Sequence, residues 1–331
     1  MDPLTHGLVG ATASSTIANK EKLRPAAATG FIAAMLADLD YYIHIPSDPL
    51  FNIEIHRQFT HSFIFIPVGA LIAAALLWLL VRKHLSFKET YLYSLAAYAT
   101  SGIMDAFTSY GTQLLWPFSD TRFAWNIISV LDPLLTIGLL TLTVICVWKK
   151  RQALVWFSWA WLILILAYGW VQKERAETAA VSLAESRGHT VDDLVVKPTI
   201  GNQLLWRANY IYDDLIFTDA IRTGWIRGVA IYEGESAPLV NIEDEFSRFE
   251  NTTLFADLQR FSRLSEGYMV RHPDEPMVIG DARYSMLPTT MVPLWGVEAD
   301  TTRADEHLPF LYFRDASEEI REPFLEMLLG R

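Results

Sequence analysis

The stretch HRQFTHS, residues 56–62, stands directly before FIFIPVGALIAAALLWLLV, residues 63–81. The second stretch is apolar throughout and long enough to cross about 30 Å of hydrocarbon as a helix. The first stretch brings two histidines, an arginine and two hydroxyl side chains to the mouth of that segment. Because such residues are costly at a membrane, they predict a polar site if other polar residues converge on the same place.

The composition indicates a membrane part joined to a soluble part. The chain has 331 residues, of which 51% are hydrophobic and 20% are charged. Residues 1–171 carry a net charge of +1, whereas residues 172–331 carry −12. We therefore predict a helical membrane domain over 1–171 that carries the site and a soluble extracytoplasmic domain over 172–331. The acidic second half argues against nucleic acid as a partner, which requires a basic surface.

Apolar runs predict the fold class of the first domain, an α-helical polytopic membrane domain of about six helices. Three runs approach the length needed to cross a bilayer, and they cover residues 63–81, 127–148 and 153–171. The run 91–107 is shorter and contains polar residues. Two weaker runs, 4–18 and 25–36, are rich in the small residues that allow close helix packing.

Basic residues predict the orientation of these helices. With six helices, the clusters between the first and second, the third and fourth, and the fifth and sixth fall on one side: Lys20, Lys22, Arg24; Arg82, Lys83, Lys88; Lys149, Lys150, Arg151. The positive-inside rule makes that side the cytoplasm. We expect a multi-pass protein of the bacterial cytoplasmic (inner) membrane with both termini outside.

This topology gathers seven ionisable side chains on the outer face: His6, Asp38, Asp40, His56, His61, Asp105 and Asp132. Imidazoles and carboxylates together suit Zn, with Mn or Fe as alternatives. Cys146 is the only cysteine, so a cysteine zinc site is excluded. The predicted metal ligands are His6, Asp38, Asp40, His56, His61 and Asp105, for one to three divalent ions.

Other interpretations of single residues stay open. Asp38 and Asp40 are two residues apart and do not share a helix face, so one could point into the site while the other supports it. The pair could also simply end a helix in solvent. Asp132 precedes Pro133, which is equally typical of a helix N-cap with proline at the first helical position. Arg57 suits bidentate contact with a phosphate or a carboxylate.

Several motifs together resemble a known family. MDPLTHGLVG (1–10), ADLD (37–40), HRQFTHS (56–62), and MDAFTSYG (104–111) followed by WPF (116–118) are similar to the YdjM-like membrane-bound metal-dependent hydrolases. The resemblance covers roughly residues 1–135, and there is a more remote similarity to zinc-dependent phospholipase C. It implies a helical metal site, phosphoester substrates, and ligands at His6, Asp40, His56, His61 and Asp105, with Asp38 as a further candidate. The later histidine helices of phospholipase C have no counterpart here, which leaves the number of ions open.

The second half predicts a small α+β domain with an antiparallel sheet. Residues 173–187 have apolar positions at helical spacing. The segments LLWRANYIY, LIFTDAIR and WIRGVAIYE (204–212, 215–222, 225–233) alternate as strands do, with a turn at Asp213–Asp214. Its aromatic residues, such as Trp206, Tyr210 and Trp225, either form a core or line a lipid or glycan groove.

The function that these patterns favour is a metal-dependent hydrolase, an enzyme acting on a phospholipid or another lipid-linked phosphoester at the outer leaflet. Arg57 would bind the phosphate, and Asp132 or Asp38 would take a proton. A transporter is disfavoured because transporters generally place their substrate site near the bilayer midplane, whereas the polar residues here lie at one interface. A metal-stabilised regulatory or scaffold protein that binds a partner through its outer domain remains the alternative.

Overall fold

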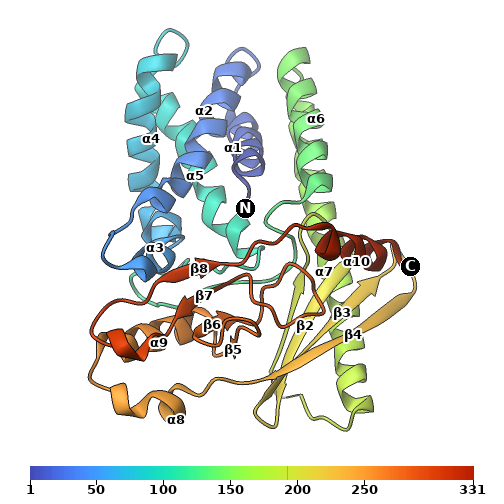
Figure 1. Ribbon diagram of the computed structural model, residues 1–331. Helices are drawn as coiled ribbons and strands as arrows, with labels where there is room; N and C mark the ends of the chain where they lie inside the picture. Colours follow the sequence, from blue (N-terminus) through green and yellow to red (C-terminus); the bar gives the residue numbers. More distant parts are fainter. Residues whose placement is uncertain (192) are drawn as a thin grey trace. The chain divides into compact units, whose positions relative to one another are not determined.

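The computed structural model describes residues 1–191 and 193–331, which form two compact units (Figure 1). Unit 1 comprises Met1–Ile43, Ile55–Trp170 and Ile200–Asn202. Unit 2 comprises His44–Glu54, Val171–Thr199 and Gln203–Arg331. The long helix α7 (Ala153–Ser186) is continuous across the boundary, so the first turns of unit 2 extend an apolar helix of unit 1.

Unit 1 is helical, and local sequence signals explain where its helices start. Besides the beginning of α7, it contains α1 (Pro3–Ile17), α2 (Leu23–Met35), α4 (Ile66–Val81), α5 (Phe87–Ala106) and α6 (Pro133–Lys149). Three short 3-10 segments complete it: η1 (Leu36–Tyr42), η2 (Phe59–His61) and η3 (Phe63–Phe65). Asp2 caps α1, and Ser86 forms a capping box with Glu89 at the start of α5.

Small residues allow α1 and α2 to pack closely. A Cβ atom on Gly10 would lie 2.4 Å from the carbonyl oxygen of Gly30, and one on Gly30 would lie equally close to the carbonyl of Gly10. The two backbones therefore touch at this crossing, as is common between helices in membranes. The contact holds the beginning of α1 and the end of α2 in a fixed geometry.

The predicted fold class is wrong in its number of membrane helices. Helices do form at all six apolar runs, but among the described residues only Phe63–Val81 and Ala153–Ser186 are long and apolar enough to cross a membrane. α6 is apolar but shorter, and α1 and α2 have only 15 and 13 residues. α5 carries many polar residues along its length. Counting apolar runs overestimated the spans because alanine, glycine, serine and threonine here serve helix packing.

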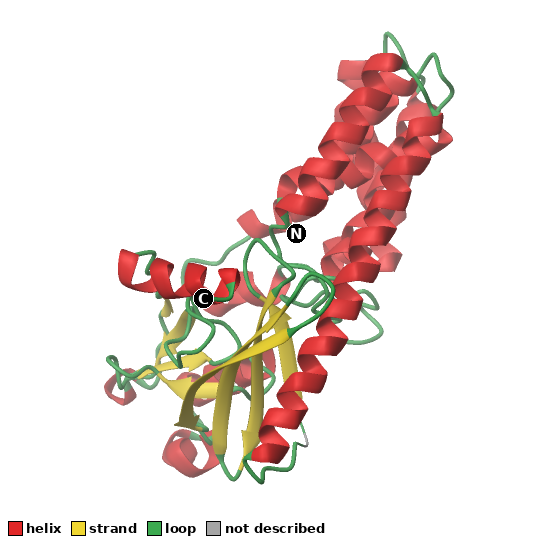
Figure 2. Cartoon of the chain, turned by 90° about the vertical axis from the view of Figure 1, so that its right-hand side faces the viewer, coloured by secondary structure: helices red, strands yellow, loops and turns green. Residues whose placement is uncertain are grey.

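Unit 2 contains a four-stranded antiparallel sheet against which the end of α7 packs (Figure 2). Its strands, in sheet order, are β1 (Leu194–Pro198), β2 (Leu205–Tyr212), β3 (Leu215–Thr223) and β4 (Val229–Pro238). Ala176 and Ala180 of α7 share one apolar core with Trp206 of β2. Asp213 and Asp214 join β2 to β3 with positive φ angles of 51° and 58°, as a two-residue hairpin turn requires.

A second four-stranded antiparallel sheet completes unit 2, which also differs from the predicted small domain with one sheet. Its strands, in sheet order, are β5 (Met269–Arg271), β6 (Val278–Asp281), β7 (Trp295–Glu298) and β8 (Phe310–Tyr312). The α-helices of this unit, apart from α7, are α3 (Pro49–Ile55), α8 (Ile242–Phe246), α9 (Thr253–Leu264) and α10 (Glu318–Leu329), and the described residues also form two 3-10 segments, η4 (Ser247–Phe249) and η5 (Thr301–Arg303). Trp206 and Tyr210 are buried, whereas Trp225 is exposed, so the aromatic residues do not share one role.

Candidate metal centre

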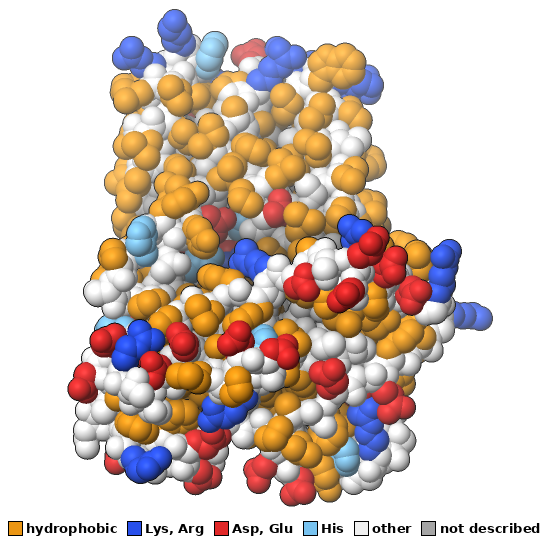
Figure 3. All heavy atoms as spheres, viewed as in Figure 1, with side chains coloured by type: hydrophobic (Ala, Val, Ile, Leu, Met, Phe, Trp, Pro, Cys, Tyr) orange, Lys and Arg blue, Asp and Glu red, His pale blue; other side chains and the backbone are white. Residues whose placement is uncertain are grey.

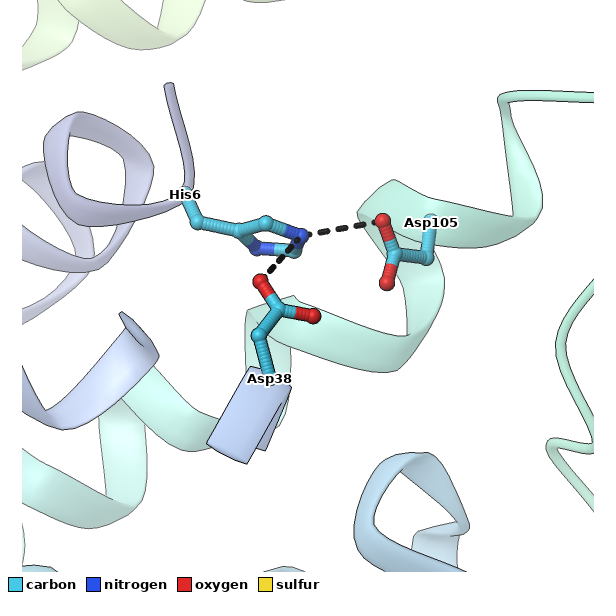
Figure 4. Close-up of side chains that lie close together, drawn as sticks. All are labelled: His6, Asp38 and Asp105. Carbon is cyan, nitrogen blue, oxygen red and sulfur yellow. Dashed lines mark hydrogen bonds and ion pairs between the residues drawn. The ribbon is translucent and has the colours of Figure 1, made fainter. Parts of the chain in front are cut away.

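Three predicted ligands from three separate elements converge in unit 1 (Figure 4). His6 lies in the first turns of α1, Asp38 in η1, and Asp105 in the last turn of α5. His6 Nε2 is 2.9 Å from Asp105 Oδ1 and 3.8 Å from Asp38 Oδ2. Their potential ligand atoms all lie within 4.8 Å of one another, which is close enough to surround one ion.

His61 joins this group as a fourth member. Its Nε2 atom is 3.3 Å from Asp38 Oδ1 and 3.1 Å from Asp105 Oδ2. The imidazole reaches this position because η2 lies directly against α5. A Cβ atom on Gly102 of α5 would lie only 2.2 Å from the backbone carbonyl oxygen of His61, so the approach requires glycine at this position.

Five buried atoms of these side chains make no hydrogen bond of good geometry among the described residues: His6 Nδ1, both carboxylate oxygens of Asp38, His61 Nε2 and Asp105 Oδ2. All of them except His6 Nδ1 lie within ion-pair distance of an imidazole, guanidinium or carboxylate group of a neighbour. Burying several ionisable groups together is costly unless each is well paired. Two imidazoles and two carboxylates are also the nitrogen and oxygen donors that Zn²⁺ accepts in a four-coordinate site. The donor set therefore fits a divalent metal ion.

Asp40 and His56 form a second layer beside this group. Asp40 Oδ1 accepts a hydrogen bond from His56 Nδ1 at 2.8 Å. Asp40 Oδ2 accepts from the backbone N–H of Arg57 at 3.0 Å and from the Thr60 hydroxyl. A 3-10 helix has three residues per turn, so Asp38 and Asp40 point in different directions. The structure thus places Asp40 against the loop that carries both histidines, and its direct ligation of a metal stays a prediction.

Opposite charges shift the pKa values in this cluster. Burial alone would raise the pKa of the Asp40 carboxyl, but the interactions with His56 and His61 outweigh burial and hold the pKa below its usual range. Burial alone would lower the pKa of His61, but the carboxylates of Asp105, Asp38 and Asp40 outweigh it and raise the pKa to about 10. The surrounding carboxylates therefore favour the protonated form of His61.

Arg57 is buried beside the group rather than extended into solvent. Its Nε atom lies 3.0 Å from Asp105 Oδ2, and its Nη1 atom donates a hydrogen bond of 3.0 Å to Thr108 Oγ1. The guanidinium also lies 5.3 Å from the centre of the Tyr110 ring. The amino group of Met1 contacts Asp105 Oδ1 as well. The sequence analysis did not single out Thr108 and Tyr110. They stand three and five residues after Asp105 in DAFTSYG, and this short distance along the chain was the signal that could have indicated them.

Asp132 serves as the N-cap of α6. Its Oδ1 atom accepts a hydrogen bond of 3.0 Å from the backbone N–H of Leu135, and Pro133 occupies the first helical position. This is the geometry of the capping alternative that the sequence left open. Among the described residues, this group of potential metal ligands consists of His6, Asp38 and Asp105 and does not include Asp132. A catalytic role for Asp132 stays a prediction.

A second cluster in unit 2, formed by Asp48, Asp257 and His307, is a weaker metal candidate. Arg260 makes ion pairs of 3.0 Å with Asp48 and 2.8 Å with Asp257, and it also contacts Glu54 at 2.6 Å. His307 Nδ1 is 2.9 Å from Asp257 Oδ2. The guanidinium already pairs with three carboxylates, those of Asp48, Glu54 and Asp257, so we interpret the cluster as an ion-pair network.

Asp40→Asn is expected to weaken metal binding about 10- to 100-fold without abolishing it, as other losses of a ligand-supporting carboxylate do. The amide keeps the size of the side chain but removes the charge that orients His56 and the loop around Thr60. Competition with a chromophoric chelator would measure the affinity. Asp120→Asn, at an exposed site of the same unit, is the matched control. A complete loss of binding, equal to that in Asp105→Asn, would instead make Asp40 a direct ligand.

Comparisons with known proteins agree with a membrane assignment. Residues 1–176 match the family model described as YdjM inner membrane protein. The chain is also similar to the uncharacterized protein YfhP of Bacillus subtilis (strain 168), with 26% identity over 208 residues. That alignment covers 60% of this chain and 62% of the relative's length. No solved structure matches the chain.

Proposed function

This chain belongs to the YdjM inner membrane protein family, and from that premise we propose that it is a membrane-embedded, metal-dependent hydrolase. The observation that carries the proposal is the convergence of two imidazoles and two carboxylates, those of His6, Asp38, His61 and Asp105, in one largely buried group. Burying several ionisable side chains together costs stability, and such clusters concentrate at functional sites. A divalent ion is the partner that their chemistry fits, with Zn first and Mn or Fe as alternatives.

The proposed chemistry divides between the ion and the surrounding side chains. When bound, a divalent ion would act as a Lewis acid and lower the pKa of a water molecule. Asp40 accepts a hydrogen bond from His56 Nδ1–H, which leaves His56 Nε2 as a proton acceptor or relay. Arg57 holds positive charge next to Asp105 and would attract an anionic substrate group. Asp38 is the most exposed of the four ligands, so the substrate would approach on its side.

The proposed substrate is a phosphoester of a lipid or of a lipid-linked molecule. Two features support this choice. The site borders the apolar segment Phe63–Val81, so a lipid headgroup at the membrane surface would lie close to it. A buried arginine beside a metal site suits the binding of phosphoryl oxygens.

We also propose the orientation of the two candidate spans. Arg82 and Lys83 follow the first span, and Lys149–Arg151 precede the second. Figure 3 shows Lys and Arg side chains gathered at one end of the helical unit. By the positive-inside rule this end faces the cytoplasm, so the chain after Val171 lies outside, as does the metal centre next to Phe63.

The experiment is a hydrolysis assay in lipid nanodiscs with a panel of phospholipids and polyprenyl phosphates. We expect release of phosphate or headgroup from at least one lipid, loss of this activity with a chelator, and its return with the metal. His56→Ala is expected to retain the metal and to lose activity about 10²- to 10⁴-fold, the usual contribution of an acid–base group. His84→Ala, an exposed histidine at the other end of α4, is the control.

The alternative is a regulatory or scaffold protein stabilised by a metal. The deep burial of His6, His61 and Asp105 is compatible with a saturated structural ion. Stoichiometric metal without hydrolysis of any lipid in the panel, together with no effect of His56→Ala on any readout, would favour this alternative over the hydrolase.

A further inference from the structure

The tip of the β3–β4 hairpin presents large apolar side chains to its surroundings. The tip comprises residues 224–228, between the end of β3 and the start of β4. Trp225 is 62% exposed and Ile226 is 84% exposed, and Val229 at the start of β4 is also exposed. Exposing adjacent tryptophan and isoleucine side chains to water at a loop tip is unfavourable, so the patch indicates an interaction surface.

Hydrogen bonds fix this tip to one particular turn of α7. Gln172 Nε2 donates to the carbonyl oxygen of Gly224 at 3.1 Å, and Arg175 Nη1 donates to the same oxygen at 2.9 Å. Arg175 Nη2 donates to the carbonyl oxygen of Gly228 at 2.8 Å. All four residues belong to unit 2, and they hold both ends of the tip against the helix.

That turn of α7 directly follows its apolar stretch. Trp170 and Val171 are exposed apolar residues at the end of the apolar run 153–171, which lies within the candidate span Ala153–Ser186, and the next residues are Gln172, Lys173 and Glu174. At 1.5 Å per residue, Gln172 and Arg175 lie only about 1.5–6 Å beyond Val171 along the helix. The hairpin tip is therefore held at the level where the helix leaves the hydrocarbon, which is where tryptophan side chains favour the membrane interface.

The charge of the hairpin segment itself fits an anionic lipid surface. Residues 172–331 carry a net charge of −12, yet residues 220–232 contain two arginines, Arg222 and Arg227, and no aspartate or glutamate. Arg175 adds a third guanidinium at the base of the tip. Basic side chains beside inserted apolar ones are typical of protein segments that bind the headgroup region of a bilayer.

We propose that the β3–β4 hairpin tip inserts Trp225 and Ile226 into the interfacial layer of the same membrane that α7 crosses. The contact gives unit 2 a second membrane anchor and prevents its first sheet from turning about the axis of α7. The inference needs only membrane insertion of α7, and it depends on neither the metal nor the hydrolysis proposed above.

The test uses single-cysteine variants of the full chain, because Cys146 is the only native cysteine and is buried. In a Cys146→Ser background, Ile226→Cys carries a fluorescent label, and Asp214→Cys is the matched control. Asp214 is an exposed turn residue at the opposite end of β3, about 30 Å away at 3.4 Å per residue. The labelled proteins are placed in nanodiscs that contain phosphatidylglycerol and a lipid with a nitroxide on its acyl chain.

We expect the label at position 226 to be quenched by the nitroxide lipid and to shift its emission to shorter wavelength, with neither effect at position 214. Absence of quenching at 226 would overturn the proposal. Equal quenching at both positions would also overturn it, because it would show that unit 2 adheres to lipid without using the tip. Replacing Arg175 with Ala should reduce the quenching at 226, since the tip then loses its attachment to α7.

Discussion

Wild-type protein purified in mild detergent is expected to hold at least one divalent ion per chain, and His61→Ala is expected to hold none. His61 Nε2 is the donor that lies close to both Asp38 and Asp105, at 3.3 and 3.1 Å. Without it, two carboxylates remain with a single imidazole, and the cavity left by the ring admits water. We expect the affinity to fall by more than the 10- to 100-fold typical of supporting residues. Elemental analysis by mass spectrometry measures the metal content directly.

Two controls make this result specific. His84→Ala removes an exposed histidine from the same unit and should leave the metal content unchanged. His56→Ala separates two hypotheses, because the sequence predicts His56 as a ligand whereas the structure pairs its Nδ1 atom with Asp40. If His56→Ala loses the ion as completely as His61→Ala does, the result would support direct ligation of the metal by His56. A metal-free wild type, even after reloading, would remove the basis for the hydrolase and favour the partner-binding alternative.

The convergence of the candidate ligands could be anticipated from the sequence for a simple energetic reason. His6, His61 and Asp105 each adjoin apolar or small residues, where an ionisable group is costly and therefore conspicuous. The sequence predicted that one of Asp38 and Asp40 could point into the site while the other supports it, but it did not decide which one does. Which of them faces the site depends on the 3-10 conformation of η1, and no periodicity in ADLDYY distinguishes that conformation from an α-helix.

The number of membrane helices could not be read from apolarity alone. In α1 and α2 the alanine, glycine, serine and threonine residues give moderate apolarity, but their actual role is the close contact at Gly10 and Gly30. The division of the strands of unit 2 into two separate sheets was not predicted, in part because the strands of the second sheet are only three or four residues long. Such strands are defined by their neighbours rather than by an alternating pattern of their own.

The assignment of residues 44–54 to unit 2 also lies beyond local reasoning. Arg260 reaches Asp48 and Glu54 across 212 and 206 positions of sequence. Leu50 belongs to the same apolar core as Phe255 and Phe261 of α9. Contacts of this range leave no signal in the residues between them, so the segment reads as a loop of the membrane part when only the sequence is considered.

Gly102→Val is expected to disrupt the metal centre without removing any ligand. Gly102 lies one turn before Asp105 on the same face of α5, and a Cβ atom there would lie 2.2 Å from the carbonyl oxygen of His61. Two further methyl groups must push η2 away from α5, which separates His61 Nε2 from Asp105. We expect a loss of stability of about 1–3 kcal/mol or more from overpacking, and at least the 10-fold loss of metal affinity seen when a ligand is misoriented.

Thermal unfolding with and without added metal, together with chelator competition, would measure both effects. Ile103→Val changes the neighbouring, exposed side chain of α5 and should alter neither quantity. If Gly102→Val kept the wild-type affinity, η2 could bind the ion without its contact to α5, and the close approach at Gly102 would be only a packing feature. If it lost the ion as His61→Ala does while both proteins remained folded, the site would depend on the position of the imidazole as strictly as on its presence.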